Sequence, residues 1–336
     1  MLRVDAERLN RIFCCELMSI GLSISDSTIL VSNLIETSLS GIDTHGIRLL
    51  PTYISEFKQG GANISPVFRF ENELLSSAIL DADGANGVIA GNAATDKAIE
   101  MARKTGIGMV LTKNSNHFGA ASSFTKQAAN QRLIAISLSN SDALVALEGG
   151  TRPFLGTNPI AMTVPGLGDD CFELDFATSQ ISYSKVKYYL QNGIDLPQNW
   201  CVDENGSDSS TSQLYAALKA LGGYKGQGIG LMVQVLTSVM SGMPYDHQLT
   251  HLYTPPFDKP RQISHWIICF NPEIFIRYEE FQSRVSELIS EARINTPSVI
   301  LPGDKEKASR EERLANGIPI DDKDYDWVNE LINKYE

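Results

Sequence analysis

The chain has 336 residues, 43% of them hydrophobic, which is enough for one large domain or two of ordinary size with a substantial core. Its formal net charge is -12 without any block of lysine or arginine, and this excludes a nucleic-acid surface, because phosphate binding needs clustered positive charge. The five cysteines lack a paired metal-type spacing, and there is neither a signal peptide nor an apolar run of membrane-spanning length. We therefore expect a cytoplasmic protein that binds neither nucleic acid nor membrane.

The N-terminal part is predicted to be helical. Apolar residues at helical spacing predict helices over 5–18, 25–41 and 49–57, with Asp5 as an N-cap and Gly60 ending the third helix.

Strands and helices alternate in the middle of the chain, which predicts a mixed α/β core. The expected strands are 78–80, 108–111, 133–139, 160–164, 172–176 and 265–270, the last of which is expected to close the sheet. The expected helices are 93–104, 120–129 and 229–240. Residues 203–212 are predicted to form a polar loop, and helices are expected over 279–294, from about 304, and at the C-terminus.

Two of the five histidines lie in polar, glycine-flanked turns between apolar segments. His45 stands in the segment from Gly41 to Arg48, and His117 in the segment from Asn114 to Gly119. Such turns are where an imidazole meets a ligand, although a helix-capping role for His45 and a plain loop role for His117 are the alternatives.

The neighbours of these histidines favour proton-transfer chemistry. If a helix begins near Gly46, Arg48 and Tyr53 project from its first two turns and bring a planar cation and a phenol close to the imidazole. The helix N-terminus near Gly119 offers backbone N–H groups to an anion beside His117.

Other motifs weaken competing interpretations. No G-x-G-x-x-G string, P-loop or G-x-S-x-G motif is present, which disfavours an ordinary Rossmann domain. His247 and His251 are four residues apart, but no catalytic glutamate follows His247 and coincidence is the better interpretation than a metal site. His265 lies within an apolar strand and is interpreted as a satisfied core or interface residue.

Four segments occur in the order of a known family's signatures: Gly41–Gly46, Asn114–Gly119, Gly156–Pro159 and Gly222–Gly226. Together they resemble the malate/L-lactate dehydrogenase family that is distinct from the Rossmann-type enzymes. The resemblance runs from about residue 5 to 302. It implies an α/β fold with a non-Rossmann, sulfolactate dehydrogenase-like NAD(P)-binding core over 78–284, and a helical domain of residues 1–77 completed by 285–336.

The resemblance also implies a nicotinamide-dependent 2-hydroxyacid oxidoreductase that forms a homodimer. Both histidines match positions with acid–base roles in different members, Arg48 matches a binder of the substrate carboxylate, and Tyr53 and Thr44 match pocket positions. The positions that match contacts to the dinucleotide are Ser141, Asp175, Phe176, Ala177, Lys225, Gly303, Asp304 and Lys305. Tyr183-Ser184 stands where the family usually has Arg-Gly, which bears on cofactor affinity or preference.

The sequence therefore predicts an enzyme that transfers a hydride between NAD or NADP, with NAD favoured, and a 2-hydroxy/2-oxo acid. Malate/oxaloacetate leads, and lactate/pyruvate, ureidoglycolate, diketogulonate and cyclic imines are the alternatives within the family. From other classes, a metal-dependent hydrolase and a non-catalytic ligand-binding protein remain open, as does which histidine moves the proton.

Overall fold

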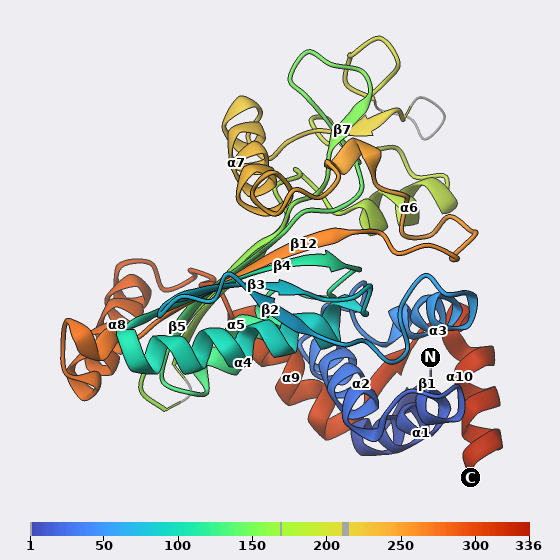
Figure 1. Ribbon diagram of the computed structural model, residues 1–336. Coiled ribbons are helices and arrows are strands. Elements are labelled where there is room, and N and C mark those ends of the chain that lie inside the picture. The colour runs from blue at the N-terminus through green and yellow to red at the C-terminus, as the bar shows by residue number, and fades with distance from the viewer. Residues whose placement is uncertain (1, 169, 210–214) are drawn as a thin grey trace.

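A central sheet separates a helical lower part from a smaller upper part in the computed structural model, which describes residues 2–168, 170–209 and 215–336 (Figure 1). The end of the polar segment predicted over 203–212 lies outside these residues. None of the helices in this part of the chain has the length and apolar character needed to cross a bilayer.

Seven strands form the main sheet within the described residues, in the order β2-β3-β4-β12-β5-β8-β9. Their bounds are β2 Arg69–Glu71, β3 Ser77–Asp81, β4 Ile107–Ser115, β5 Ile134–Ser139, β8 Ile160–Pro165, β9 Cys171–Phe176 and β12 Ile263–Phe270. β12 pairs antiparallel with both β4 and β5, so it lies inside the sheet and does not close it, contrary to the sequence prediction.

The register brings several strand ends to one edge of this sheet. Ser115 at the end of β4 pairs with Ile263 at the start of β12, and Ser139 at the end of β5 pairs with His265. Ile160, which begins β8, pairs with Phe176, which ends β9. Loops that leave or enter these five strand ends therefore meet along the same edge.

Two helices pack on one face of the sheet: α4 (Gly87–Thr105) and α5 (Ser122–Ala129). α4 begins six residues before the predicted start at 93, because the Asn86 side chain accepts the Val88 N–H and caps the helix there. Gly108 lets the helix approach β4, since a Cβ at this position would overlap the Ala98 carbonyl.

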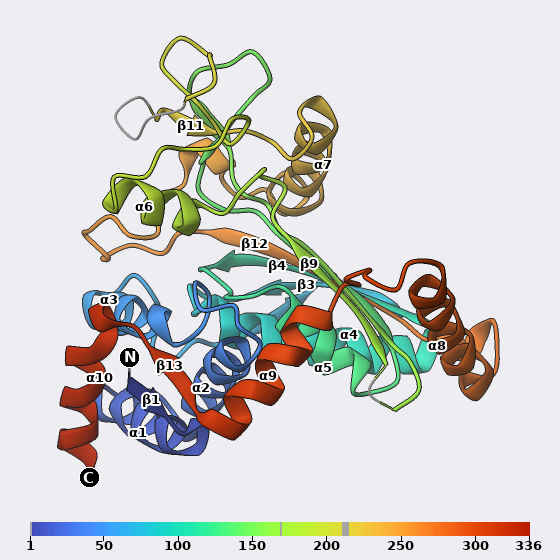
Figure 2. The ribbon, with the colours of Figure 1, turned by 180° about the vertical axis from the view of Figure 1, so that it is seen from behind.

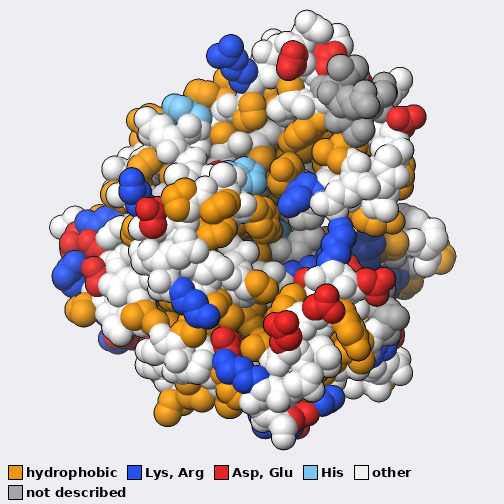
Figure 3. Space-filling model, turned by 90° about the vertical axis from the view of Figure 1, so that its right-hand side faces the viewer, with side chains coloured by type: hydrophobic (Ala, Val, Ile, Leu, Met, Phe, Trp, Pro, Cys, Tyr) orange, Lys and Arg blue, Asp and Glu red, His pale blue; other side chains and the backbone are white. Residues whose placement is uncertain are grey.

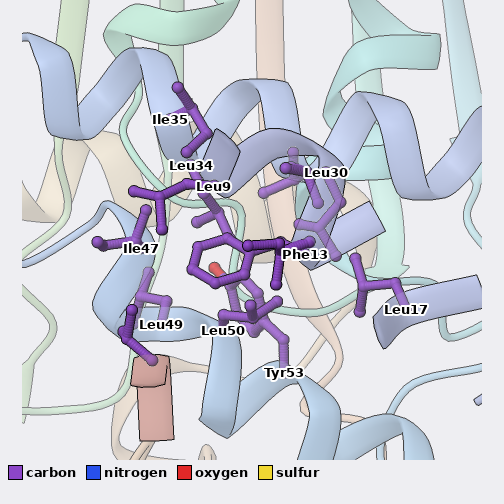
Figure 4. Close-up of a cluster of buried hydrophobic side chains, with 14 of the residues drawn as sticks. Leu9, Phe13, Leu17, Leu30, Leu34, Ile35, Ile47, Leu49, Leu50 and Tyr53 are labelled. Atoms are coloured by element: carbon purple, nitrogen blue, oxygen red, sulfur yellow. The ribbon is translucent and has the colours of Figure 1, made fainter. Parts of the chain in front are cut away.

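The helical lower part contains segments from both chain ends (Figure 2). Its elements are β1 Leu2–Val4, α1 Ala6–Ser19, α2 Ile24–Leu39, the 3-10 turn Ile47–Leu49, α3 Leu50–Gln59, α9 Asp304–Asn316, β13 Ile318–Ile320 and α10 Asp322–Tyr335. β1 pairs with β13, which joins the two ends. Leu9, Phe13, Leu34 and Tyr53 are fully buried in the core that these helices share (Figure 4).

The upper part holds a second, four-stranded sheet of order β10-β11-β6-β7 among the described residues. Its elements are β6 Val145–Ala146, β7 Pro153–Leu155, α6 Tyr183–Gln191, β10 Cys201–Val202, β11 Ala217–Leu218 and α7 Tyr224–Gln234, which continues as a π-helical turn over Val235–Val239. Helix α8 (Tyr278–Asn295) packs against β8 and β9. The short strands of this sheet were not predicted, and α7 begins five residues before the predicted helix 229–240.

Candidate active site

A cavity of about 290 Å³ opens at the sheet edge where the five strand ends meet. The molecule is hollowed on this side, and acidic and basic side chains gather below the hollow (Figure 3). The predicted site residues that line the cavity are Thr44, His45, His117, Ser141, Asp175, Phe176 and Ala177. The fold thus brings together residues that are up to 133 positions apart in the sequence.

His117 lies in the loop after β4, and two donors hold its Nδ1 atom. The hydroxyl of Tyr53 lies 2.8 Å from Nδ1, and the Gly119 backbone N–H donates to the same atom at 3.3 Å. Because the Gly119 amide can only donate, Nδ1 acts as the acceptor and the neutral ring carries its proton on Nε2. Burial, and to a lesser extent His45, lower the pKa of His117 well below its usual range.

His45 lies in the turn between α2 and α3, with its ring against that of His117. The ring centroids are 5.6 Å apart and the planes are inclined by 24°. The Nδ1 atom of His45 is 2.8 Å from the hydroxyl of Thr44, which can donate or accept. Burial lowers the pKa of His45 to about 4, so both imidazoles are neutral at pH 7.

A buried ion pair fixes Tyr53 on α3. One turn after Tyr53, the Glu56 carboxylate accepts hydrogen bonds from Nε and Nη2 of Arg261, at 3.0 and 2.8 Å. Arg261 also donates to the carbonyls of Thr250 and Leu252. The pair therefore ties α3 to the segment that leads into β12, and this holds the phenol in place beside His117.

Arg48 does not line the cavity in this chain. Its Nε donates to Asp324 at 2.9 Å, and its guanidinium also contacts Asp321, both at the start of α10. Its charge still acts on Tyr253, a tyrosine of the cavity wall. The guanidinium thus lies near the site and is held by two carboxylates.

The segment Gly156–Pro159 positions Ser141 after β5. The Ser141 N–H donates to the Asn158 side chain at 3.2 Å, and the Thr157 N–H donates to the Ser141 hydroxyl at 3.0 Å. Buried Asp246 in turn accepts from the Asn158 amide and the Gly156 N–H, both at 2.8 Å. The predicted motif therefore holds the loop that carries Ser141.

Asp175 at the end of β9 accepts the N–H of Ser122, the first residue of α5, at 2.9 Å. Burial raises the pKa of Asp175 to about 6, although the hydrogen bonds from Ser122 act in the opposite direction. The backbone amides near Gly119 were predicted to be free for an anion. This is wrong for the amides of Gly119 and Ser122, since the first donates to His117 and the second to Asp175.

The remaining predicted dinucleotide contacts lie outside this cavity. Gly303 and Asp304 line an adjoining groove of about 520 Å³, and Glu306 lines both spaces. A Cβ at Gly303 would come within 3.2 Å of the Glu173 side chain, so the absence of one keeps this groove open. Lys305 and Lys225 are exposed and line neither space.

An extended dinucleotide fits this arrangement. Ser141 and Phe176 line the cavity, Gly303 lines the groove, and Glu306 lines both. A long ligand with polar groups along its length matches two joined spaces of this kind better than a compact one does.

The other three histidines have separate partners. His265 is fully buried, with Nδ1 3.0 Å from Ser139 Oγ and Nε2 2.9 Å from Ser115 Oγ, so its interpretation as a satisfied core residue is confirmed. His247 stacks on Phe154, with ring centroids 4.7 Å apart, whereas His251 lines the cavity. Among the described residues, no three metal-ligating side chains form a cluster.

Several residues of the cavity were not predicted as site residues, among them Asp142, Tyr183, His251 and Tyr253. Asp142 directly follows the predicted Ser141, and Tyr183 stands at the departure from the family pattern. Both positions gave a signal in the sequence, whereas His251 had been considered only as a metal ligand.

The family model described as malate/L-lactate dehydrogenase matches residues 4–329 of this chain. The chain belongs to this family. It is 34% identical to a malate dehydrogenase of Pyrococcus abyssi, over 99% of this chain and 94% of that protein. It is 30% identical to the NAD(+) ureidoglycolate dehydrogenase of Escherichia coli O157:H7, over 97% and 95%. The solved sulfolactate dehydrogenase of Methanocaldococcus jannaschii has the same mixed α/β fold, with a TM-score of 0.92 and 29% identity over 99% and 97% of the two chains.

Membership identifies the chain as a dehydrogenase that acts on the CH–OH group of 2-hydroxy acids. Family members use NAD(+) or NADP(+). The recognition of the family from its four segments is thereby confirmed.

Proposed function

We propose that this dehydrogenase interconverts a 2-hydroxy acid and the corresponding 2-oxo acid, with malate/oxaloacetate as the first substrate pair to test. The observation that carries the proposal is the pair of neutral imidazoles, His45 and His117, in one cavity with Tyr53 holding Nδ1 of the second. The relatives named as malate dehydrogenases, at 34% and 32% identity, favour malate among the 2-hydroxy acids.

The hydrogen bonds favour different roles for the two histidines. Reduction of a 2-oxo acid adds a hydride to the carbonyl carbon and a proton to its oxygen. His117 has Nδ1 fixed as an acceptor by Gly119 and Tyr53, so it suits a hydrogen bond from Nε2–H to the oxygen. Among the described residues, the ring of His45 bonds to the Thr44 hydroxyl alone, through Nδ1, and this hydroxyl can accept as well as donate. The neutral ring can therefore take the hydroxyl proton on Nε2 when the 2-hydroxy acid is oxidised, and the protonated ring returns it when the 2-oxo acid is reduced.

Arg48 is our candidate for the carboxylate next to the reacting carbon. A guanidinium binds a carboxylate through two parallel hydrogen bonds. In this chain Asp321 and Asp324 hold that guanidinium, so a substrate carboxylate would replace one of them as the partner.

Ser141, Asp175, Phe176 and Ala177 would hold the nicotinamide half of NAD(P), and Gly303 and Asp304 the other half. When bound, the nicotinamide supplies or takes up the hydride. Lys225 and Lys305 would contact the dinucleotide only after a movement or through a second subunit, since both are exposed on this chain.

We favour NAD over NADP. Three of the four basic side chains that line the groove are already paired: Lys126 with Glu173, Arg293 with Asp304 and Arg310 with Glu36. A 2′-phosphate needs a cation that is available to it, whereas a ribose hydroxyl is bound by carboxylates.

A homodimer is proposed from an apolar face on α7 and its π-helical turn. Exposed side chains on this face are Tyr224, Leu231, Met232, Val235, Val239 and Met240. Apolar groups gathered on one helix are typical of a subunit interface.

The experiment is a panel of reductions followed by NADH and NADPH absorbance, with oxaloacetate, pyruvate and a cyclic imine as substrates. We expect oxaloacetate turnover with NADH, and a loss of turnover by 10²-fold or more in His45→Ala and His117→Ala, on the order expected for removing an acid–base group. The affinity for NADH, from fluorescence titration, should change far less. No turnover with any 2-oxo acid would refute the proposal, while turnover of the imine alone would select the alternative within the family.

A further inference from the structure

A second polar pair, Asp142 and His251, lines the cavity that holds His45 and His117. Asp142 follows the end of β5, and His251 lies in the segment that leads into β12. Neither has a part in the proton transfer proposed above. Their placement and hydrogen bonds suggest a role in holding the substrate.

The ring of His251 has a defined orientation and tautomer. The Tyr253 backbone N–H donates to its Nδ1 at 3.2 Å, so the neutral ring carries its proton on Nε2. Tyr183 packs edge-on against the ring, with centroids 5.5 Å apart. Arg261 binds the carbonyls on both sides of His251, at Thr250 and Leu252. His251 therefore offers a fixed N–H donor.

Asp142 offers one carboxylate oxygen, Oδ2, that has no donor among the described residues. The residue is 9% exposed, and its Oδ2 is buried without a hydrogen-bond partner among the described residues. The nearest cationic candidate is Nε2 of His251 at 3.7 Å, which is beyond hydrogen-bond distance. Burial raises the pKa of Asp142, while His251, Arg261 and the backbone amide of Leu252 act in the opposite direction and favour its charged form.

The spacing of the sheet places this pair at the far end of a small substrate. His117 and Asp142 follow β4 and β5, which are separated by β12 alone. Two strand spacings amount to about 10 Å. A four-carbon acid that lies with its reacting carbon at the two imidazoles reaches the pair with its other end.

The charges of the cavity disfavour a second carboxylate at that end. Among the described residues, no lysine or arginine lines the cavity, while Asp142, Asp175 and Glu306 do. Arg261 acts on Asp142 from behind the wall but is already paired with Glu56, so a distal carboxylate would meet the oxygen of Asp142 with no unpaired cation on the wall to balance the repulsion. A carboxamide, in contrast, accepts from Nε2–H of His251 with its oxygen and donates to Oδ2 of Asp142 with its N–H.

We propose that Asp142 and His251 bind the distal end of the substrate and select a neutral group that both donates and accepts a hydrogen bond, such as a carboxamide or ureido group. The proposal rests on the 2-hydroxy acid function given above and narrows its substrate. It makes malate itself a poorer substrate than a 2-hydroxy acid of the same size with an amide in place of the second carboxylate.

Malate and its C4 monoamide provide the test, because they have the same number of heavy atoms and differ in charge at the distal group. The ratio of kcat/KM for the amide to that for malate is measured with NAD+. We expect a ratio above ten in the wild type, and a fall of at least tenfold in Asp142→Asn, which keeps the shape and removes the charge. Glu306→Gln removes a different cavity carboxylate and should leave the ratio within twofold.

A second variant tests the donor. His251→Phe keeps a ring against Tyr183 and removes the N–H group, so kcat/KM for the amide should fall at least fivefold. Melting temperatures establish that each variant folds, and either variant alone is sufficient to test the proposal.

Calorimetric binding of both acids in the presence of NAD+ distinguishes failure of the proposed reaction from failure of the proposed selection of the distal group. If neither acid turns over but the amide binds more tightly in an Asp142-dependent way, the proposed reaction fails and the selection stands. Turnover with a ratio that Asp142→Asn leaves unchanged overturns the selection alone. A wild-type preference for malate, or no binding of either acid, also overturns it.

Discussion

Tyr53→Phe tests whether the phenol sets the tautomer of His117. The variant removes the hydroxyl that lies 2.8 Å from Nδ1 and leaves only the Gly119 N–H, at 3.3 Å, to hold that atom as an acceptor. A neutral hydrogen bond contributes about 1 to 1.5 kcal/mol, so the balance between the Nε2–H and Nδ1–H forms should shift roughly five- to tenfold toward Nδ1–H. Since only the Nε2–H form suits the proposed bond to the substrate oxygen, kcat should fall with the population of this form, by up to the same factor.

The tautomer is measured directly by ¹⁵N NMR of protein labelled in histidine, at pH 7.5, where the His117 resonances are assigned with a His117→Gln variant. Tyr183→Phe is the matched control, because Tyr183 lines the same cavity and contacts His251 instead of His117. We expect Tyr53→Phe alone to move the ¹⁵N shifts of His117 toward the Nδ1–H form. If kcat falls while these shifts stay as in the wild type, the phenol does not set the tautomer of His117 and acts by another route.

Three further outcomes are expected. Burial lowers the pKa of His265 to about 3, so the stability that its neutral form provides is fully present above pH 6.5, and about 3 kcal/mol of it is lost between pH 6.5 and pH 4.5. In urea unfolding, the free energy of unfolding of His265→Gln should therefore fall less over this pH range than that of the wild type, and an equal fall in both proteins would contradict this. Arg261→Lys keeps the charge but loses the four guanidinium hydrogen bonds to Glu56, Thr250 and Leu252, so the free energy of unfolding should fall by about 3 kcal/mol. Amide hydrogen exchange over 250–253 should become faster, and unchanged exchange would show that other contacts hold this segment. Lys225→Ala should weaken NADH binding about tenfold at an unchanged melting temperature, as expected for one lost charge-assisted contact, whereas unchanged affinity would make Lys225 a plain surface lysine.

Sequence patterns predicted those site residues whose positions depend on the local conformation of the chain. The glycine-flanked turns position His45 and His117, and helical spacing places Tyr53 on the buried side of α3. The same spacing placed Arg48 beside the imidazole, but Asp321 and Asp324 bind it from α10, more than 270 residues further along the chain. No pattern around Arg48 indicates such partners, because the pairing of β1 with β13 is what brings α10 to this position.

The order of the main sheet explains why the Asp142–His251 pair was not predicted. A strand over 265–270 was expected from its apolar run, and a run of this kind gives no information about its neighbours. Only the insertion of β12 between β4 and β5 brings the segment before it, with His251, to the loop after β5, with Asp142. Likewise, the helix ends near Gly119 were expected to offer free amides, and the fold supplies His117 and Asp175 as their acceptors.

The excess of acidic residues in the chain affects the site because carboxylates pair with the basic side chains near it. An anionic substrate has to be bound in a protein of net charge -12 whose cavity wall carries three carboxylates and, within the described residues, no lysine or arginine. Arg48 at the rim is paired with two further carboxylates. One substrate carboxylate can replace one of these partners, since the exchange leaves the local charge balance almost unchanged. A second substrate carboxylate would lie in the cavity, where no such ion pair is present among the described residues whose acidic partner it could replace. We therefore expect a monoanionic substrate with a neutral distal group.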